Sequence, residues 1–419
     1  MIQKPKGTKD ILPDESFIWN YVENVAQYEV FENYGFKEIR VPTFEYTELF
    51  QRGVGETTDV VQKEMYTFVD KGERSLTLRP EGTAGIIRAY IENGLSSKAS
   101  PLKLWYKMLV FRYENVQKGR DREFNQIGCE VIGTNSYLAD IEVITIAYNI
   151  LKNLGLIEHI ELNINSIGCP TCRAKYQQAL KKFIGNNLNK YCDTCKTRFE
   201  KNPMRILDCK EEKCKKLNEG APVILDFLCE ECSEHFENVK NTLNELGINY
   251  KVDPGIVRGL DYYTKTVFEF ISKEEGYTVI GGGRYDGLVK ELGGTDTPAV
   301  GFGMGEERLI GLVSKNKDLK DINAEIYIAT MGKKEQIIEA LKLANELRQY
   351  MIVETDINSR SLNSQLKYAN KIGADNLLVL GDEELATNCA KIKNMKSGTE
   401  YDVELDAKEI YEKILEIEE

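Results

Sequence analysis

The chain has 419 residues and a net charge of −12, with 42% apolar and 29% charged residues. These values are typical of a globular protein of two or three domains and exclude an intrinsically disordered chain. The sequence holds neither an apolar run long enough to span a membrane nor a secretory leader after Met1, so we expect a cytoplasmic protein with no membrane partner.

The first predicted elements are a helix and several extended segments. Apolar residues recur at helical spacing through residues 14–34, and Gly35 follows as a stop signal. Extended segments come next at residues 38–42, 75–79, 104–113 and 123–132. Because few helical segments separate them, they favour an antiparallel sheet over βαβ units.

Polar residues share one face of the predicted strand 124–130. The two-residue period of a strand places Gln126, Gly128 and Glu130 on that face. Since glycine inside a strand favours close approach of another group, these residues could form the floor of a site for a small polar ligand. An exposed sheet face is the alternative, and this strand alone favours it.

Arg112 ends the preceding strand and leads into a basic, flexible loop at residues 115–122. The arginine fork fits carboxylate or phosphate oxygens, and the loop could meet the end of a nucleic acid. An ordinary surface hairpin is the alternative.

A basic, cysteine-rich segment interrupts the sheet pattern from residue 167. Between Arg173 and Lys216, 13 Lys and Arg stand against 5 Asp and Glu, a local charge of +8. This charge could guide a polyanion or could solvate helical faces. Eight cysteines form three C-x2-C pairs and one C-x4-C pair, a spacing that fits two four-thiolate zinc sites better than disulfides in a reducing compartment. They are Cys169, Cys172, Cys192, Cys195, Cys209, Cys214, Cys229 and Cys232.

The sheet pattern resumes with strands at residues 266–270 and 278–280 and a glycine-rich stretch that runs to Leu309. Residues 301–308 predict a strand that turns into a helix, where glycines admit a flat ligand and Arg308 meets its phosphates. A dinucleotide-binding fingerprint is disfavoured because these glycines do not open an N-terminal βαβ unit. Cys129 and Cys389, outside the cysteine cluster, are expected to be ordinary buried residues.

The end of the chain has a different pattern. Residues 314–323 are polar and predict a linker. Beyond it, strands at residues 326–329, 352–355 and 377–380 alternate with helices at 335–349, 364–372 and the chain end. This alternation predicts a small α/β domain with a partly parallel sheet.

Six segments in order resemble the class II aminoacyl-tRNA synthetases, and the histidyl enzymes in particular. Residues 34–42 resemble motif 1, residues 104–114 resemble motif 2 with Arg112, and residues 301–309 resemble motif 3 with Arg308. The other three, similar to segments of the histidyl enzymes, are Thr-Leu-Arg-Pro-Glu-Gly-Thr at 77–83, Arg-Gly-Leu-Asp-Tyr-Tyr at 258–263 and Gly-Gly-Gly-Arg-Tyr-Asp at 281–286. Each segment is weakly specific by itself, whereas all six in order are very specific.

The resemblance implies an α+β protein with an antiparallel-sheet catalytic core. This core would comprise residues 1–166, with motifs 1 and 2, and residues 241–320, with motif 3. An inserted subdomain would occupy residues 167–240, and a C-terminal α/β anticodon-binding domain residues 324–419. The resemblance also implies a homodimer formed through motif 1.

The implied activity is ATP-dependent ligation of L-histidine to histidine tRNA through histidyl-adenylate, with Mg2+ accompanying ATP. In the family, the α-amino group of histidine is held by the residues that match Glu81, Thr83 and Gln126. The imidazole is held by those that match Glu130 and Tyr263, with Tyr262 lining the pocket. Arg112, Arg258 and Arg308 match the catalytic, ATP-binding arginines, and the first two also bind the amino acid. The loop at 115–122 would contact the acceptor end of the tRNA.

Two alternatives remain beside this function. A regulatory paralogue of ATP phosphoribosyltransferase would have lost the tRNA-binding domain and several site residues, yet both are present here. A synthetase for another amino acid is disfavoured by Glu130 and the segment 258–263. Many family members lack the eight cysteines, so any zinc here would be structural.

Overall fold

The computed structural model describes residues 2–55, 58–209, 211–256, 258–319, 321 and 323–418. The chain forms two compact units, residues 1–319 and 320–419. Lys320, the last residue of the predicted core, and Ile322 in the predicted linker lie outside the described residues. Within the described ranges, no helix is both long and apolar enough to cross a membrane.

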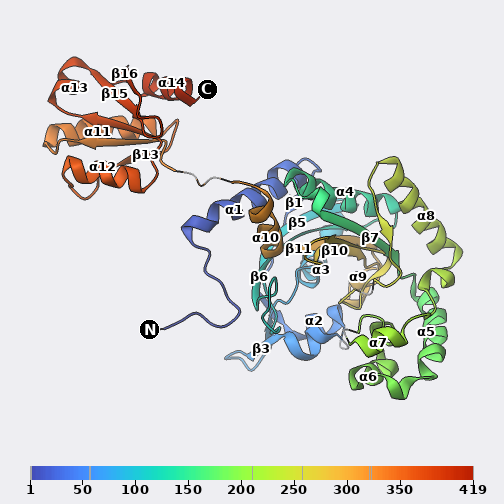
Figure 1. The fold of residues 1–419 in the computed structure, drawn as a ribbon. Coiled ribbons are helices and arrows are strands. Elements are labelled where there is room, and N and C mark those ends of the chain that lie inside the picture. Colours follow the sequence, from blue (N-terminus) through green and yellow to red (C-terminus); the bar gives the residue numbers. More distant parts are fainter. Residues whose placement is uncertain are drawn as a thin grey trace. The chain divides into compact units, whose positions relative to one another are not determined.

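A large sheet forms the centre of the first unit. Its strands are β1 (Lys37–Glu38), β5 (Leu102–Phe111), β6 (Glu123–Ile132), β7 (Ile160–Ser166), β8 (Lys251–Val252), β9 (Thr264–Ser272), β10 (Thr278–Arg284) and β11 (Ala299–Gly305). The eight strands have the order β1-β5-β6-β11-β10-β9-β7-β8 (Figure 1). All neighbours are antiparallel except the pairs β1–β5 and β7–β8. The predicted antiparallel sheet is confirmed.

One face of this sheet packs against α4 (Tyr137–Asn153), α8 (Glu230–Glu245) and α10 (Glu306–Asn316), and α1 (Pro13–Asn24) lies against α10. The ring of Phe31 stacks on Trp105 in the core of this layer, with centroids 5.4 Å apart. Ile127, Cys129 and Val131 of β6 belong to the same core. The alternate residues of β6 therefore face the other side of the sheet, as the two-residue period predicts.

The predicted helix at residues 14–34 is α1 followed by wider π-helical turns at Val25–Phe31. The chain then turns through Gly35, whose φ of 75° lies in the left-handed region that favours glycine.

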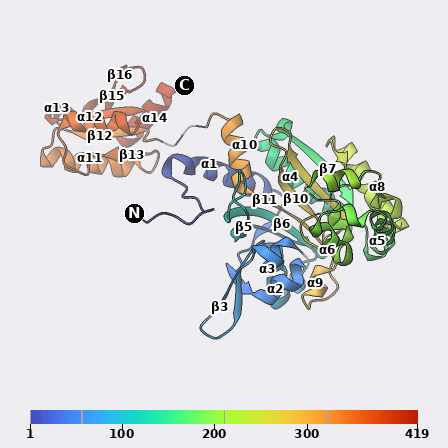
Figure 2. The same cartoon turned by 60° about the horizontal axis from the view of Figure 1, so that its bottom comes forward.

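The opposite side of the sheet carries α2 (Thr47–Val54), α3 (Thr83–Glu92) and α9 (Leu288–Glu291), and Figure 2 shows α2 and α3 on the side away from α4 and α10. A small sheet with the order β2-β4-β3 lies next to them, formed by Phe44–Tyr46, Ser75–Leu78 and Tyr66–Val69, respectively. Arg79 ties it to the large sheet, because its guanidinium donates to the carbonyls of Val41 at 2.8 Å and Leu109 at 2.6 Å.

The insert contains α5 (Pro170–Gly185), α6 (Asp193–Lys201) and α7 (Glu212–Leu217) before the chain enters α8. α8 runs to Glu245, beyond the predicted boundary at residue 240. Its buried residues Phe236, Val239 and Leu243 belong to the core of the large sheet, so the end of α8 packs with the core rather than with the insert.

The second unit is a five-stranded sheet covered by helices. Its strands are β12 (Ile326–Thr330), β13 (Val353–Thr355), β14 (Asn376–Leu380), β15 (Cys389–Asn394) and β16 (Glu400–Glu404). Its helices are α11 (Lys334–Leu347), α12 (Leu362–Lys371), α13 (Asp382–Thr387) and α14 (Ala407–Glu418). β12 is parallel to β13 and β14, whereas β15 is antiparallel to both of its neighbours, β14 and β16. The partly parallel sheet is confirmed.

One cysteine prediction was wrong. Cys129 is buried as expected, but Cys389 is exposed. Cys389 opens β15, whose burial alternates, so that Ala390 and Ile392 point inward while Cys389 points to solvent.

Candidate functional site

The predicted floor lies where β6 meets β11, on the sheet face opposite α4. In this register Glu130 faces Gly301 and Gly128 faces Gly303. A Cβ atom on Gly301 would overlap the Glu130 carboxylate, and one on Gly303 would overlap the Gln126 amide. From the sequence, we expected these glycines to make room for a flat ligand. In the structure they make room for side chains of β6 instead.

Gly128 also makes room for a protein group. A Cβ atom there would come within 2.5 Å of the Tyr106 hydroxyl oxygen. The bare backbone that the sequence suggested as a ligand floor is thus covered by the ring of Tyr106.

Glu130 is the buried acid of this floor, with 1% of its surface exposed. Its carboxylate accepts a hydrogen bond from Thr83 Oγ1 at 2.8 Å and another from the Tyr285 hydroxyl. Burial raises the pKa of Glu130 to about 8, although the hydrogen bonds from Tyr285 and Thr83 oppose this effect. A ligand that brings its own N–H groups or positive charge would match this carboxylate.

Glu81 lies in the same buried cluster and caps α3. Its two carboxylate oxygens accept the backbone N–H groups of Thr83 and Ala84, each at 2.8 Å. The Tyr262 hydroxyl donates to Glu81 at 3.5 Å, and the rings of Tyr262 and Tyr263 lie 4.7 Å apart. The structure therefore brings Glu81, Thr83, Glu130 and the two tyrosines together, as the sequence predicted.

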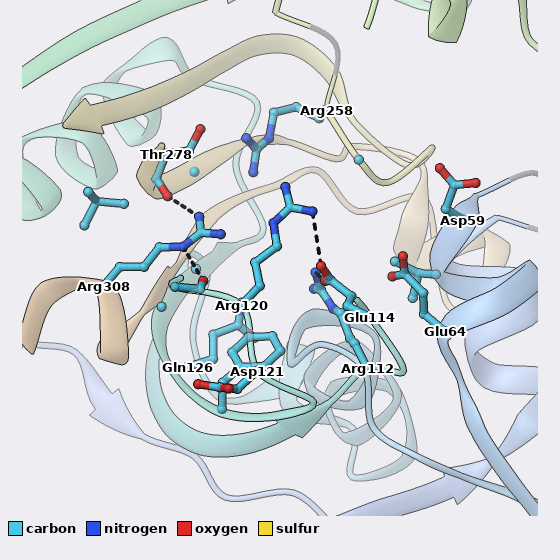
Figure 3. Close-up of a pocket in the computed structure, with 18 of the residues that line it drawn as sticks. Asp59, Glu64, Arg112, Glu114, Arg120, Asp121, Gln126, Arg258, Thr278 and Arg308 are labelled. Atoms are coloured by element: carbon cyan, nitrogen blue, oxygen red, sulfur yellow. Dashed lines mark hydrogen bonds and ion pairs between the residues drawn. The ribbon is translucent and has the colours of Figure 1, made fainter. Parts of the chain in front are cut away.

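A cavity of about 370 Å³ contains the remaining predicted residues: Gln126, Arg112, Arg258 and Arg308 all line it. Figure 3 shows the guanidinium groups of Arg120, Arg258 and Arg308 converging toward its centre. Several guanidinium forks around one space fit a polyanion such as a nucleoside triphosphate.

Arg112 and Arg258 are held in fixed orientations. Arg112 Nε donates to the Pro80 carbonyl at 2.8 Å, and its guanidinium lies 5.4 Å from the centre of the Phe124 ring. Arg258 forms an ion pair with Glu269, and a Cβ atom on Gly281 would overlap its guanidinium. Both arginines are thus oriented before any ligand arrives, which lowers the cost of reorganisation during a reaction.

Arg308 connects the cavity to the loop at 115–122. Its Nε donates to the Gly119 carbonyl at 3.0 Å, and another guanidinium nitrogen donates to Thr278 O. Lys118 pairs with Glu275 at 2.7 Å, and hydrogen bonds from Lys118 and Lys315 lower the pKa of Glu275 to about 2. The loop makes defined contacts here, although its sequence suggested flexibility.

Carboxylates also face the cavity, among them Glu64, Glu114, Asp121 and Glu307. Burial, followed by the charge of Glu114, raises the pKa of Glu64. Glu307 accepts the Asn125 backbone N–H at 2.7 Å, and burial raises its pKa as well. Such oxygens suit a hard divalent cation that accompanies phosphate groups.

The eight cysteines form two separate tetrads, in each of which the four sulfur atoms lie within 4.8 Å of one another. The first tetrad is Cys169, Cys172, Cys229 and Cys232, at the beginnings of α5 and α8. The second is Cys192, Cys195, Cys209 and Cys214, around α6 and α7. Four sulfurs at this separation could surround one tetrahedral zinc ion.

The sequence did not single out several residues of this site. Tyr285 could have been suspected, because it lies within the quoted segment 281–286 beside other site residues. Arg198, Arg205 and Asp208 of the insert also line the cavity. No sequence signal distinguished these two arginines, since they are among 13 basic residues of similar character between Arg173 and Lys216.

Comparisons with known proteins point to one family. A sequence model described as histidyl-tRNA synthetase matches residues 7–309, and one described as an anticodon binding domain matches residues 325–417. A histidine–tRNA ligase of Clostridium botulinum is 54% identical over 413 residues, covering 98% of this chain and 98% of the relative. One from Acetivibrio thermocellus is 52% identical, covering 97% and 98%. The apo histidyl-tRNA synthetase of S. aureus has a TM-score of 0.82 at 40% identity, covering 98% of this chain and 99% of that one.

Proposed function

This chain belongs to the histidyl-tRNA synthetase family, and from that premise we propose how its residues divide the work. It is a class II aminoacyl-tRNA synthetase that ligates L-histidine to its tRNA through histidyl-adenylate, and the family implies ATP with Mg2+ as the substrate complex. The near full-length match to histidine–tRNA ligases supports this catalytic role over that of the regulatory paralogue.

The buried cluster is the proposed histidine pocket. Glu81, Thr83 and Gln126 would bind the α-amino group, while Glu130 and Tyr263 would bind the imidazole and Tyr262 would line the pocket. Imidazole carries a donor and an acceptor on opposite edges, so it can satisfy a buried carboxylate and a phenol at once. An apolar analogue would bring no N–H donor to the buried Glu130 carboxylate, and sites of this kind reject such analogues by roughly 10⁴-fold.

The cavity is the proposed ATP site. A carboxylate oxygen of histidine attacks the α-phosphorus, forming the acyl–phosphate bond and breaking the bond to pyrophosphate. Arg112 and Arg258 would bind the histidine carboxylate and the α-phosphate, while Arg308 would bind the terminal phosphates. Negative charge develops on phosphoryl oxygens in this step, so fixed cations and positioning supply most of the catalysis. Glu114 and Glu307 are candidate ligands for the accompanying Mg2+.

In the second step a ribose hydroxyl of the terminal tRNA nucleotide attacks the histidyl carbonyl and releases AMP. The loop at 115–122 is the proposed contact to the acceptor end, because it lies against Arg308 and carries Lys118 and Arg120. The second unit, which matches an anticodon binding domain, would bind the anticodon.

The observation that carries these roles is the juxtaposition of Gln126 in the cavity with Glu130 in the buried cluster, four residues apart on one strand face. We would measure histidine-dependent ATP–pyrophosphate exchange across the amino acids, with Arg258→Ala beside the unmodified protein. Exchange with histidine alone, lost in the variant, is expected. Exchange that persists in the variant would contradict the assigned role of Arg258.

Each cysteine tetrad is the proposed ligand set of one structural zinc ion. Cys169 Sγ lies 3.5 Å from Cys172 Sγ and 4.0 Å from Cys229 Sγ, and Cys192 Sγ lies 3.9 Å from Cys209 Sγ. Close approach of four thiols fits thiolates gathered around a metal. Elemental analysis should find two zinc ions per chain, and protein without zinc would contradict the proposal.

Two further properties are proposed for the whole protein. Its compartment is the cytoplasm, where the cysteines would stay reduced. It would be a homodimer through motif 1, because the adjoining strands β2 and β3 expose Phe44, Tyr46, Phe68 and Val69. A monomeric mass in sedimentation equilibrium would contradict the dimer.

A further inference from the structure

Asp261 lies in the segment 258–263, which connects the two halves of the proposed site. Arg258 at its start lines the cavity, whereas Tyr262 and Tyr263 at its end lie in the buried cluster. Between them Asp261 faces the insert. The Arg205 guanidinium donates to Asp261 Oδ1 from Nη2 at 2.9 Å and from Nε at 3.1 Å.

The insert forms two further hydrogen bonds with this segment. Arg205 Nη2 also donates to the Gly259 carbonyl at 2.8 Å, and Asn202 Nδ2 donates to Asp261 Oδ1 at 3.2 Å. The far side of the segment is fixed by α2, since the Asp261 backbone N–H donates to the Val54 carbonyl at 3.2 Å. The segment is therefore clamped between α2 and the insert.

Arg205 is well suited to act as a brace. It is 8% exposed and lies in a single turn of 3-10 helix, Pro203–Ile206. Its carbonyl accepts a hydrogen bond from Arg198 Nη1 at 3.2 Å, and Arg198 Nη2 donates to Asp59 at 3.0 Å. A planar guanidinium that meets a carboxylate and a carbonyl together fixes direction as well as distance.

The second tetrad encloses the segment that carries Arg205. Cys192 and Cys195 lie at the start of α6, and Cys209 and Cys214 follow the 3-10 turn. α6 has nine residues and α7 has six, lengths at which helices are not stable by themselves. A zinc ion bound by these four sulfurs would join both ends of the segment and hold Arg205 in place.

We infer that zinc in the second tetrad positions Arg205 on Asp261 and so sets the segment 258–263 for adenylate formation. Arg205 lines the cavity, but its guanidinium donates to Asp261 and Gly259, and we therefore assign it as a positioning residue that acts through these two residues. The inference rests on the proposed function and on the proposed zinc ions. It assigns the insert a part in the first chemical step, before any tRNA is bound.

The test compares pyrophosphate exchange in four full-length variants: Cys195→Ser, Arg205→Ala, the double variant and Arg205→Lys. The concentration of active sites is determined from the burst of adenylate, and kcat is calculated per active site. The zinc content of each preparation is measured separately. A displacement of about 1 Å can cost 10²-fold in rate, so we expect kcat to fall about 10- to 100-fold in Cys195→Ser and in Arg205→Ala. The KM for ATP should change by less than about threefold, since Arg112 and Arg308 lie outside the segment 258–263.

The zinc content and kcat of the variants distinguish loss of the Arg205 contact from general loss of the fold. Arg205→Ala should keep two zinc ions, whereas Cys195→Ser should keep one. The double variant should lose no more than either single variant, because both changes act on one contact. Arg205→Lys, which keeps the charge but not the fork, should recover part of the lost kcat. Cys389→Ser is the matched control, since Cys389 is exposed and lies outside both tetrads.

Three outcomes would overturn the inference, and they differ from one another. An unchanged kcat in Arg205→Ala would show that the brace has no role. If Cys195→Ser loses one zinc ion but keeps its full kcat, the metal has no role in adenylate formation. The proposal that the tetrads bind zinc would remain. Unmodified protein that exchanges pyrophosphate without zinc would refute the metal but not the proposed function.

Discussion

The catalytic sheet and the inserted subdomain position their side chains by different means. On the sheet, the register between β6 and β11 brings Gln126 and Glu130 to the glycines that accommodate them, above a packed layer of helices. In the insert, α6 and α7 span nine and six residues, and the second tetrad supplies four of the buried side chains. The sheet needs no ligand to be rigid, whereas short helices need a cross-link.

The two regions are therefore sensitive to different substitutions. On the sheet, a methyl group added to Gly301 or Gly303 would displace a side chain of the site, because no space remains between these glycines and Glu130 or Gln126. The insert tolerates surface changes but depends on its sulfur ligands. Changes in the two regions should therefore give different patterns of lost activity and lost stability.

The largest effect is expected at Arg112, which directly follows β5 and donates to the Pro80 carbonyl. Arg112→Ala removes a fixed cation from the proposed α-phosphate site. Because one such donor contributes about 10²- to 10³-fold to kcat, exchange should fall by that amount. Lys290→Ala is the control, since Lys290 forms an exposed ion pair with Asp296. Equal losses in both variants would contradict the assigned role.

A smaller, selective effect is expected for Gly303→Ala. The added methyl group would push away the Gln126 amide, a flexible side-chain end, so the fold should change little. The KM for histidine should rise about 10- to 100-fold, since one lost hydrogen bond to a charged group is worth about 1.5–3 kcal/mol. Gly311→Ala is the matched control, because a Cβ atom there meets no atom within 4 Å. An unchanged KM in Gly303→Ala would remove Gln126 from the pocket.

The smallest effect is expected for Glu306→Gln, in the layer beneath the sheet. Glu306 is buried, and burial, followed by the charges of Glu23 and Glu307, raises its pKa from 4.5 to about 9. An acid with a raised pKa stabilises the fold fully below its unfolded value, and this contribution disappears as pH rises toward 9. Glutamine cannot ionise, so the variant should gain thermal stability relative to the unmodified protein from pH 5 to 9. A difference in melting temperature that is constant across this range would contradict the assignment.

Much of the sheet and its site followed from periodicity. The alternation in β6 predicted that Gln126, Gly128 and Glu130 share one face of the sheet, and the resemblance to the family supplied Glu81, Thr83 and Tyr263, which lie in the buried cluster. Sequence alone did not predict that Gly128 leaves space for the Tyr106 side chain and Gly301 for the Glu130 side chain. Such space depends on which residues of neighbouring strands lie opposite each glycine.

The insert was less predictable. Cysteine spacing indicated metal, but the partition into two tetrads depends on the path of the chain between α5 and α8. Arg205 was indistinguishable from the other basic residues, since its partner Asp261 lies 56 residues away. The β15–β16 hairpin was missed because polar residues dominate both strands.

Hydrogen–deuterium exchange of the full-length protein before and after zinc removal by a chelator tests the contrast most directly. Loss of a cross-link should open α6, α7 and the turn that carries Arg205, while β5, β6 and β11 keep their protection. We expect backbone amides of residues 192–217 to exchange at least about tenfold faster, with the sheet amides unchanged. Equal loss of protection in the sheet, or an insert that stays protected without zinc, would contradict the account.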